Sequence, residues 1–185
     1  MTDHVVGLDL SLTSTGVATI DPEGVVVLDR WRPNATGHPR LDWLGDQVAH
    51  VIAGARLVVM EGPAYGSAKL ASASGQHERA GLWWLVAHQV WRAGIPMAVV
   101  PPNVRAMYGA GKGNAGKDEV LAAVIRRHPA LPIRGNDQAD ALILAAMGVR
   151  HLGRPLEEFL PQENLRAMER TSWPEATGPL RGLAS

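Results

Sequence analysis

Three short apolar runs follow one another near the amino terminus before any helical pattern begins. They are His4–Leu10, Thr15–Ile20 and Gly24–Trp31. The connection from Asp21 to Gly24 has the residues of a tight turn, because Pro presets one backbone angle and Gly permits a positive one. Short connections join antiparallel strands, whereas parallel strands need long crossovers. The chain is therefore expected to begin with three antiparallel strands.

Strand and helix patterns alternate after these three runs. A Pro- and Gly-rich loop precedes the later elements. The expected helices are Leu41–Ile52, Gln76–Arg92, about Lys117–His128 and about Asp137–Val149, and the expected strands are Arg56–Glu61 and Pro96–Val100. A sheet that starts with hairpins and gains later strands through helical crossovers has both faces covered. The sequence predicts an α/β fold with a mixed five-stranded sheet and helices on both faces.

Length and composition suit one domain with a tail. The chain has 185 residues, enough for a single well-cored domain over residues 1–150. Residues 151–185 contain four prolines and at most a short helix near Gln162–Arg170, so we expect a tail of unknown function. There is no cysteine for a zinc-thiolate site, and no apolar stretch approaches the roughly 18 residues of a membrane span. We expect a cytoplasmic protein without a membrane partner.

The charges are unevenly distributed although the formal net charge is zero. Residues 1–61 carry four Arg against eight acids, whereas residues 62–135 carry nine Lys or Arg against three acids, a difference of +6. Proteins that bind nucleic acid need a local basic surface rather than a basic average. The middle of the chain is thus the part expected to meet phosphate groups.

Four acidic residues stand where carboxylates are costly or well placed for a site. Asp9 lies inside the apolar run His4–Leu10, and Glu61 ends a strand of apolar residues. A carboxylate in a core strand is unfavourable unless it is paired or binds a metal. Asp137 and Asp140 are three residues apart at the start of a helix, so both fall on one face. These four side chains could converge on one site.

Clustered carboxylates repel one another unless cations neutralise them. Oxygen ligands without cysteine favour Mg²⁺ or Mn²⁺ over Zn²⁺. Two such ions about 4 Å apart promote phosphodiester hydrolysis. Each acid also has a plainer interpretation: Asp137 and Asp140 suit a helix N-cap with a partner acid three residues on, Glu61 suits a strand-end turn, and an Asp in a Gly-x-Asp strand is common in ATP-binding folds.

The motifs together resemble those of RuvC-type Holliday-junction resolvases, which belong to the ribonuclease-H-like superfamily. The matching segments lie in the expected order between residues 5 and 150. They are Gly7–Ala18 with Asp, Ser, Thr and Gly, Met60–Pro63 at the second acid, Ala115–Val120 as an Ala-x-Lys-x-x-Val helix start, and Asn136–Ala141 as the closing acidic helix. The resemblance implies a ribonuclease-H-like fold.

The resemblance also implies an activity and a role for each matched residue. The chain would be a Mg²⁺-dependent endonuclease for four-way or other branched DNA, giving 5′-phosphate and 3′-hydroxyl ends, with Mn²⁺ as a substitute metal. Asp9 would bridge two metal ions, Glu61 and Asp140 would each hold one, and Asp137 would complete the site or orient water. Lys117 would steady the scissile phosphate.

Further residues are expected to contact DNA or a second subunit. The DNA-binding candidates are Ser11, Thr13, Tyr65, Lys69, Arg79, Lys112 and Lys117, with Tyr65 as the aromatic wedge for the junction centre. RuvC-like enzymes act as dimers, which implies a homodimer here. Because Trp83, Trp84 and Trp91 follow an apolar helical pattern, they are expected in the core or at a dimer interface rather than stacked on bases, and their helix is the expected interface.

Two alternatives remain open at this stage. A branched-DNA binder could keep the fold without cleaving, although all four acids are present. An ATP-binding protein of the actin and sugar-kinase type also has an Asp-containing first strand followed by Ser, Thr and Gly. Proteins of that type need two such domains around the nucleotide, and 185 residues supply one.

Overall fold

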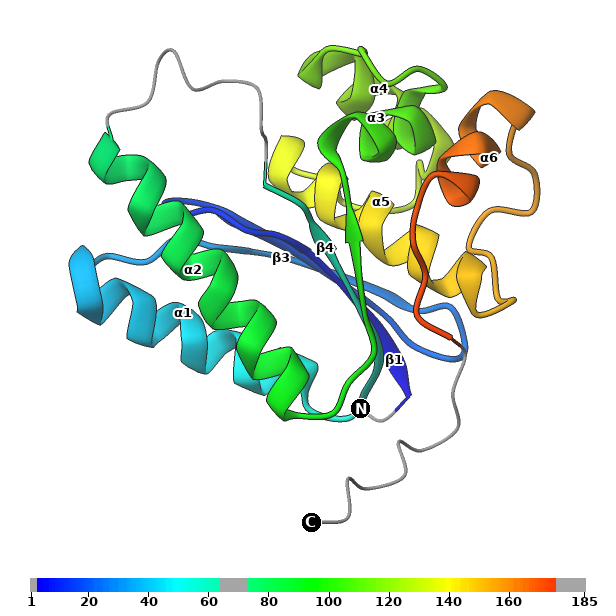
Figure 1. The fold of residues 1–185 in the computed structure, drawn as a ribbon. Helices are drawn as coiled ribbons and strands as arrows, with labels where there is room; N and C mark the ends of the chain where they lie inside the picture. Colours follow the sequence, from blue (N-terminus) through cyan, green and yellow to red (C-terminus); the bar gives the residue numbers. More distant parts are fainter. Residues whose placement is uncertain (1–2, 64–72, 176–185) are drawn as a thin grey trace.

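The computed structural model describes residues 3–63 and 73–175 and has one mixed sheet (Figure 1). Its strands are β1 (His4–Asp9), β2 (Thr15–Ile20), β3 (Val26–Trp31), β4 (Ala55–Glu61) and β5 (Met97–Val100). The spatial order is β3-β2-β1-β4-β5. The first three strands are antiparallel, whereas β4 runs parallel to β1 and β5 parallel to β4. The predicted mixed five-stranded sheet is confirmed.

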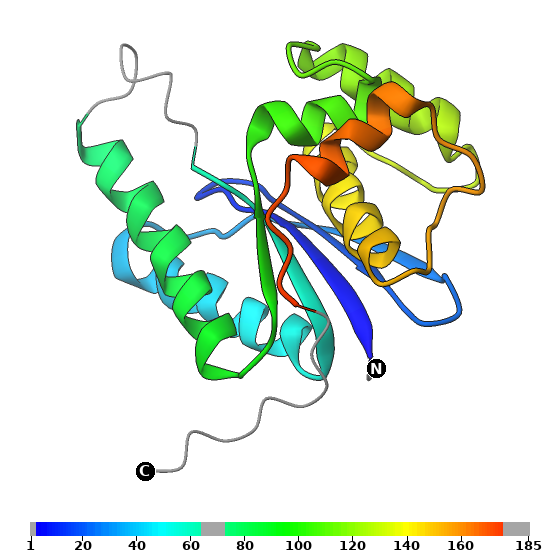
Figure 2. The same cartoon turned by 45° about the vertical axis from the view of Figure 1, so that its right-hand side comes forward.

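Helices cover both faces of this sheet, as the sequence predicts (Figures 1 and 2). On one side lie α1 (Gly37–Ile52) and α2 (Ala73–Arg92). On the other lie α3 (Pro102–Ala110), α4 (Lys117–Arg127), α5 (Asn136–His151) and α6 (Gln162–Glu169). In the described parts of the chain, no helix is long and apolar enough to cross a membrane.

The two core layers follow from the alternation of side chains along β1. Val6 and Leu8 point to the side of α1 and α2, where they join a cluster that includes Leu44. Val5 belongs to the opposite cluster, which includes Leu142 of α5. Because side chains alternate across a strand, a strand buried on both faces is apolar throughout, and β1 is buried from His4 to Leu8.

Helix α5 lies directly against the sheet at positions without side chains. A Cβ atom on Gly7 of β1 or on Gly16 of β2 would overlap the backbone of α5, at Ala141 and Asp137 respectively. These two glycines therefore let the helix start approach the strands that end at the acidic edge. The position of Asp137 and Asp140 depends on this close contact.

We expect Gly16→Ala to lower the free energy of unfolding by roughly 1–3 kcal/mol, because the added methyl group must push α5 away from β2. Urea unfolding followed by tryptophan fluorescence measures the change. Gly81→Ala is the matched control, since its methyl group would meet nothing within 4 Å on a helix. The control should be neutral or slightly stabilising. Equal stability of Gly16→Ala and the unsubstituted protein would contradict the packing described here.

Two helices differ from their sequence predictions. Helix α3 was not predicted, because Pro101 and Pro102 indicate a break, yet Pro is well tolerated in the first turn of a helix. Gly111 ends α3 in the left-handed conformation with φ of 82°. Helix α1 begins at Gly37 rather than Leu41, so the predicted loop is shorter.

The segment after α5 packs back onto α3 instead of extending away from it. Buried Glu157 accepts hydrogen bonds from the Tyr108 hydroxyl at 2.9 Å and from Arg150 at 3.1 Å. Burial alone would raise the pKa of Glu157, but its interactions with His128, Tyr108 and Arg150 hold that pKa at about 2. Asn164 of α6 donates to the Tyr108 carbonyl at 2.7 Å. A domain boundary at residue 150 stays a prediction.

Candidate functional site

Asp9 and Glu61 lie at the same edge of the sheet. Strands β1 and β4 are parallel with Leu8 opposite Met60, so the residues that follow, Asp9 and Glu61, end neighbouring strands. Carboxyl ends of parallel strands form the edge where α/β folds place their ligands. Asp9 is also paired with Gly16, on which the start of α5 rests. Three separate elements thus bring acids to one edge.

The acids interact strongly through their charges. Burial raises the pKa of Asp9 to about 8, and repulsion from Glu61 and Asp140 adds to the rise. Burial also raises the pKa of Asp140 to about 6, where Arg105 acts in the opposite direction and Glu61 adds repulsion. Such mutual effects require the groups to lie close together. Asp9, Glu61 and Asp140 therefore form one cluster, called the acidic cluster below.

Arg105 of α3 lies at the centre of the acidic cluster. Its Nε donates to Glu61 Oε2 at 2.7 Å, and its Nη1 donates to Asp140 Oδ1. Only about a tenth of its side chain is exposed. Helix α3 directly follows β5, the neighbour of β4, so it starts at the same edge of the sheet. A buried guanidinium thus already balances part of the negative charge.

Asp137 has a different hydrogen-bond partner from Asp140. The Ser14 hydroxyl, in the loop between β1 and β2, donates to Asp137 Oδ2 at 2.5 Å. The N-cap of α5 is Gly135, and no side chain caps this helix, so the capping interpretation of Asp137 and Asp140 does not apply. Lys117, the first residue of α4, is near enough to favour the charged form of Asp140.

The arrangement of side chains does not by itself form a metal cage. Over residues 3–63 and 73–175, no three acids or histidines are grouped so that they could hold a metal ion. The donor set is nevertheless made of carboxylates, the ligands that Mg²⁺ and Mn²⁺ prefer. Arg105 fills the space between Glu61 and Asp140. A metal ion would have to compete with this arginine for at least one carboxylate.

The predicted DNA-binding residues are spread over three places. Ser11 and Thr13 lie in the β1–β2 loop that also carries Ser14, with 3.4 Å between their hydroxyl oxygens. Lys112 forms an exposed ion pair with Glu119 at 2.8 Å. Arg79 is exposed on α2 and donates to the Gly75 carbonyl. Tyr65 and Lys69 lie outside the described residues.

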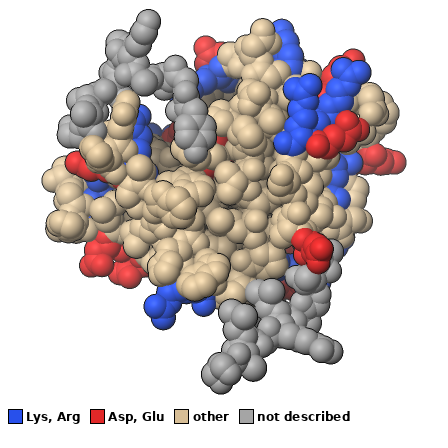
Figure 3. Space-filling model, viewed as in Figure 1, with Lys and Arg blue, Asp and Glu red and all other residues tan. Residues whose placement is uncertain are grey.

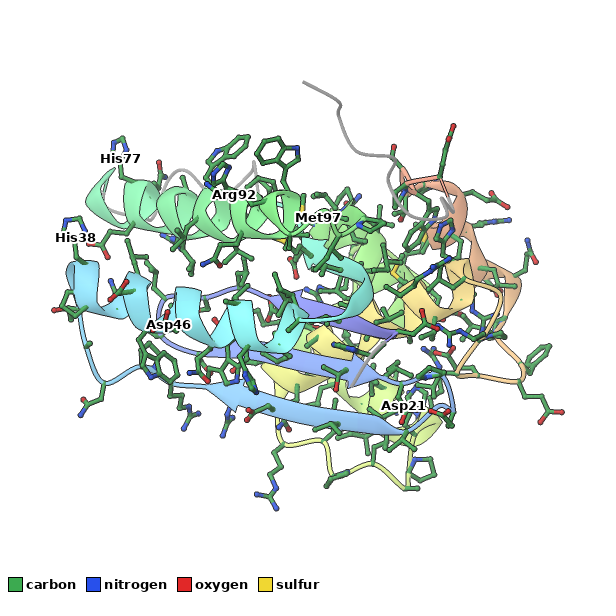
Figure 4. The ribbon with its side chains drawn as sticks, turned by 90° about the horizontal axis from the view of Figure 1, so that it is seen from below. Asp21, His38, Asp46, His77, Arg92 and Met97 are labelled. Atoms are coloured by element: carbon green, nitrogen blue, oxygen red, sulfur yellow. The ribbon has the colours of Figure 1, made fainter. Side chains whose placement is uncertain are left out.

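The three tryptophans of α2 have different surroundings. Trp83 is partly buried and its Nε1 donates to the Glu61 carbonyl at 3.0 Å, which ties α2 to the end of β4. Trp84 and Trp91 are 68% and 70% exposed. His88 stacks on Trp91 with 5.5 Å between ring centroids. Aromatic side chains project from α2 away from the sheet (Figure 4). The centre of the molecular face seen in Figure 3 is largely uncharged.

We expect Asp9→Asn to stabilise the protein at pH 8 by roughly 2–5 kcal/mol when divalent cations are absent. The pKa of Asp9 rises from 3.8 to about 8 on folding, and one unit corresponds to about 1.4 kcal/mol. Between about pH 4 and pH 8 the folded protein keeps a proton that the unfolded chain has lost, so stability falls as pH rises. Urea unfolding in EDTA at pH 5 and pH 8 measures this difference.

Asp46→Asn, at an exposed acid on α1, is the control for this pH dependence. It should unfold like the unsubstituted protein at both pH values. If Asp9→Asn brought no gain in stability at pH 8, Asp9 would not be buried among like charges.

Two residues of the site were missed from the sequence. Ser14 is one of several hydroxyl residues in its loop, and nothing in the sequence singles it out. Arg105 had a detectable signal, because it is a charged residue between two apolar ones, Val104 and Ala106, five residues after the end of a predicted strand. A buried charge needs a partner of opposite sign, and the predicted acidic site was the obvious one.

Comparisons with known proteins bear on this fold. No protein-family model matches the sequence, and no curated protein matches it. The structure of Thermus thermophilus RuvC is 20% identical, with a TM-score of 0.62 over 82% of this chain and 97% of that chain. The structure of T. thermophilus RuvC in complex with a Holliday junction substrate is 17% identical, with a TM-score of 0.61 and the same coverage. The resemblance predicted from the motifs is confirmed for the architecture: the chain has the RuvC fold, a ribonuclease-H-like mixed α/β fold.

Proposed function

We propose that this chain is a divalent-metal-dependent endonuclease that cleaves Holliday junctions or related branched DNA. The observation that carries the proposal is the convergence of Asp9, Glu61 and Asp140 at the carboxyl edge of a RuvC-type sheet. A buried cluster of carboxylates is costly for a fold and is best explained by cation chemistry. Branched DNA is named because the similar T. thermophilus protein was captured with a Holliday junction substrate.

The acidic cluster is the proposed metal site, and two Mg²⁺ ions are its proposed occupants, with Mn²⁺ as a substitute. Asp9, Glu61 and Asp140 would be the ligands, and Asp137 would complete the set or orient water. Bound metal would supply Lewis-acid activation of the phosphodiester and of the attacking water. The products would be a 5′-phosphate and a 3′-hydroxyl.

The remaining residues of the site would position the DNA. Lys117 is near enough to favour the charged form of Asp140 and would hold the scissile phosphate by charge. Ser14 keeps the Asp137 carboxylate oriented through its hydrogen bond. Arg105 would release Asp140 or Glu61 when a divalent ion binds and would then be free to meet phosphate. Ser11, Thr13, Arg79 and Lys112 are the proposed contacts to the DNA backbone.

We further propose that the protein is a homodimer that pairs through α2. The exposed side chains of Trp84 and Trp91 lie seven residues apart, and such spacing places them on one helix face. Large apolar side chains at an exposed face favour an interface. Sedimentation velocity of Trp84→Ala/Trp91→Ala should give a monomer where the unsubstituted protein gives a dimer. A dimer that survives this double substitution would place the interface elsewhere.

Two other functions compete with this proposal. A silent branched-DNA binder would keep affinity for junctions but would not cleave them. An ATP-binding protein of the actin and sugar-kinase type would bind nucleotide instead. The acidic cluster favours the nuclease over the silent binder, because junction binding alone does not need three converging carboxylates.

Cleavage of a synthetic four-way junction tests the proposal. The intact protein is incubated with end-labelled junction, fork, flap or linear duplex in Mg²⁺ or in EDTA, and the products are sized and their ends analysed. We expect cleavage of branched DNA in Mg²⁺, ligatable nicks, and no cleavage in EDTA or with Asp9→Asn. Junction binding without cleavage in either Mg²⁺ or Mn²⁺ would contradict the proposed nuclease activity and would support the silent branched-DNA binder instead.

A further inference from the structure

An open pocket of about 510 Å³ lies at the start of α1. It is lined by the β1–β2 loop, through Leu12 and Thr13, and by the segment from Pro33 to Thr36 together with Arg40. The polar groups in this lining are hydroxyls, an amide and a guanidinium, and the lining residues include no acid. The pocket therefore offers hydrogen-bond donors and a positive charge.

Arg40 is the charged group of this pocket, and it is mostly covered. Its side chain is 12% exposed, whereas its ion-pair partner on α2, Glu78, is 48% exposed. The Arg40 Nε is buried and has no hydrogen-bond partner. A guanidinium has five donors in a planar fork that matches phosphate. His38 of α1 and His77 of α2, close in sequence to Arg40 and Glu78, lie at the adjoining ends of the two helices (Figure 4).

The start of α1 adds to the positive character of the pocket. Its N-cap residue, Thr36, makes no side-chain cap, and the first turn contains no acid. The backbone N–H groups of a first helical turn lack partners within the helix and favour anions. Thr36, the N-cap residue, lines the pocket together with Arg40.

The pocket and the acidic cluster share one loop. Thr13 lines the pocket, and its neighbour Ser14 donates to Asp137 at the other site. Only three residues separate Asp9, at the end of β1, from Thr13. A nucleic-acid strand held at the acidic cluster would therefore carry its next phosphates toward Arg40.

We infer that this pocket is a backbone phosphate subsite for the DNA strand being cut, with Arg40 as its charged contact. The inference rests on the proposed function, because it takes DNA as the occupant. Glu78 is the more exposed member of the ion pair. It would give up part of its contact with the Arg40 guanidinium when phosphate binds. The subsite would position the strand without touching the reacting phosphate.

DNA binding in EDTA tests the inference separately from cleavage. Fluorescence anisotropy with a labelled four-way junction is measured over a range of salt for the unsubstituted protein, Arg40→Gln and Glu78→Gln. We expect Arg40→Gln to weaken binding roughly tenfold and to reduce the salt slope by about one. Glu78→Gln removes the same ion pair but keeps the arginine, so its affinity should be equal or higher. Equal losses in both variants would reduce Arg40 to a structural role and overturn the inference.

A scan with neutral methylphosphonate linkages locates the contact. Each junction in the scan carries a single neutral linkage at one backbone position. A neutral linkage near the cut site should weaken junction binding by the unsubstituted protein but should not weaken binding by Arg40→Gln. If Arg40→Gln does not fold, Arg40→Lys replaces it. We expect Arg40→Lys to bind the junction more weakly than the unsubstituted protein but with the same salt slope. If every linkage affects both proteins alike, the subsite does not exist, whereas cleavage by the intact protein would still uphold the proposed function.

Discussion

Asp140→Asn is expected to slow cleavage of a four-way junction by roughly 10²- to 10³-fold, the loss typical of one charge-stabilising group in an active site. Asp140 is buried, contacts Arg105, and is repelled by the charges of Glu61 and Asp9. The substitution keeps the size of the side chain but removes one charged ligand from the cluster. Single-turnover rates in Mg²⁺, with binding measured separately in EDTA, give the effect on the chemical step.

Asp46→Asn is the control for this loss. Asp46 is an exposed acid on α1 with no proposed role in the site, so its substitution should leave the cleavage rate unchanged. Asp140→Asn should bind the junction at least as tightly as the unsubstituted protein, because a negative charge has been removed. A cleavage rate for Asp140→Asn within threefold of the unsubstituted rate would exclude Asp140 from the metal site.

Arg105→Met is expected to make the stability of the protein depend on divalent cations. Loss of the arginine leaves Glu61 and Asp140 buried without their partner, and removal of one member of a buried ion pair costs about 3–5 kcal/mol. Millimolar Mg²⁺ should restore part of this stability by binding the freed carboxylates. Thermal unfolding in EDTA and in Mg²⁺ measures the recovery, and the gain should exceed that of the unsubstituted protein.

Arg150→Met separates this cation response from general destabilisation. Arg150 also pairs with a buried acid, Glu157, but Arg150 lies in the last turn of α5, whereas Asp140 of the acidic cluster lies near the start of that helix. Its loss should destabilise the protein with no recovery in Mg²⁺. If both arginine variants responded to Mg²⁺ to the same degree, the recovery would not come from the carboxylates of the cluster.

Local sequence patterns were sufficient to predict most of the elements. Short apolar runs predict the five strands, because a strand that is buried on both faces is apolar along its whole length. Helix α3 was not predicted, because the two prolines at its start, Pro101 and Pro102, fit a loop as well as a first helical turn. The side-chain partners could not be predicted in the same way, since they depend on which elements meet in space.

The four acids show which contacts could be predicted from the sequence and which could not. Asp9 and Glu61 could be placed together from their positions at strand ends, and the edge geometry confirms that they are neighbours. The spacing of Asp137 and Asp140 predicted one shared face, yet Asp137 turns to Ser14 and Asp140 to Arg105. That difference arises because the β1–β2 loop and α3 approach α5 from different sides, which no spacing within α5 encodes.

Anomalous diffraction from crystals soaked in Mn²⁺ tests most directly whether the acidic cluster is a metal site. The account predicts a manganese peak bonded to carboxylate oxygens of Asp9, Glu61 or Asp140, with the Arg105 guanidinium moved away from at least one of them. A well-ordered cluster without a peak, in which Arg105 still bridges Glu61 and Asp140 at saturating Mn²⁺, would contradict it.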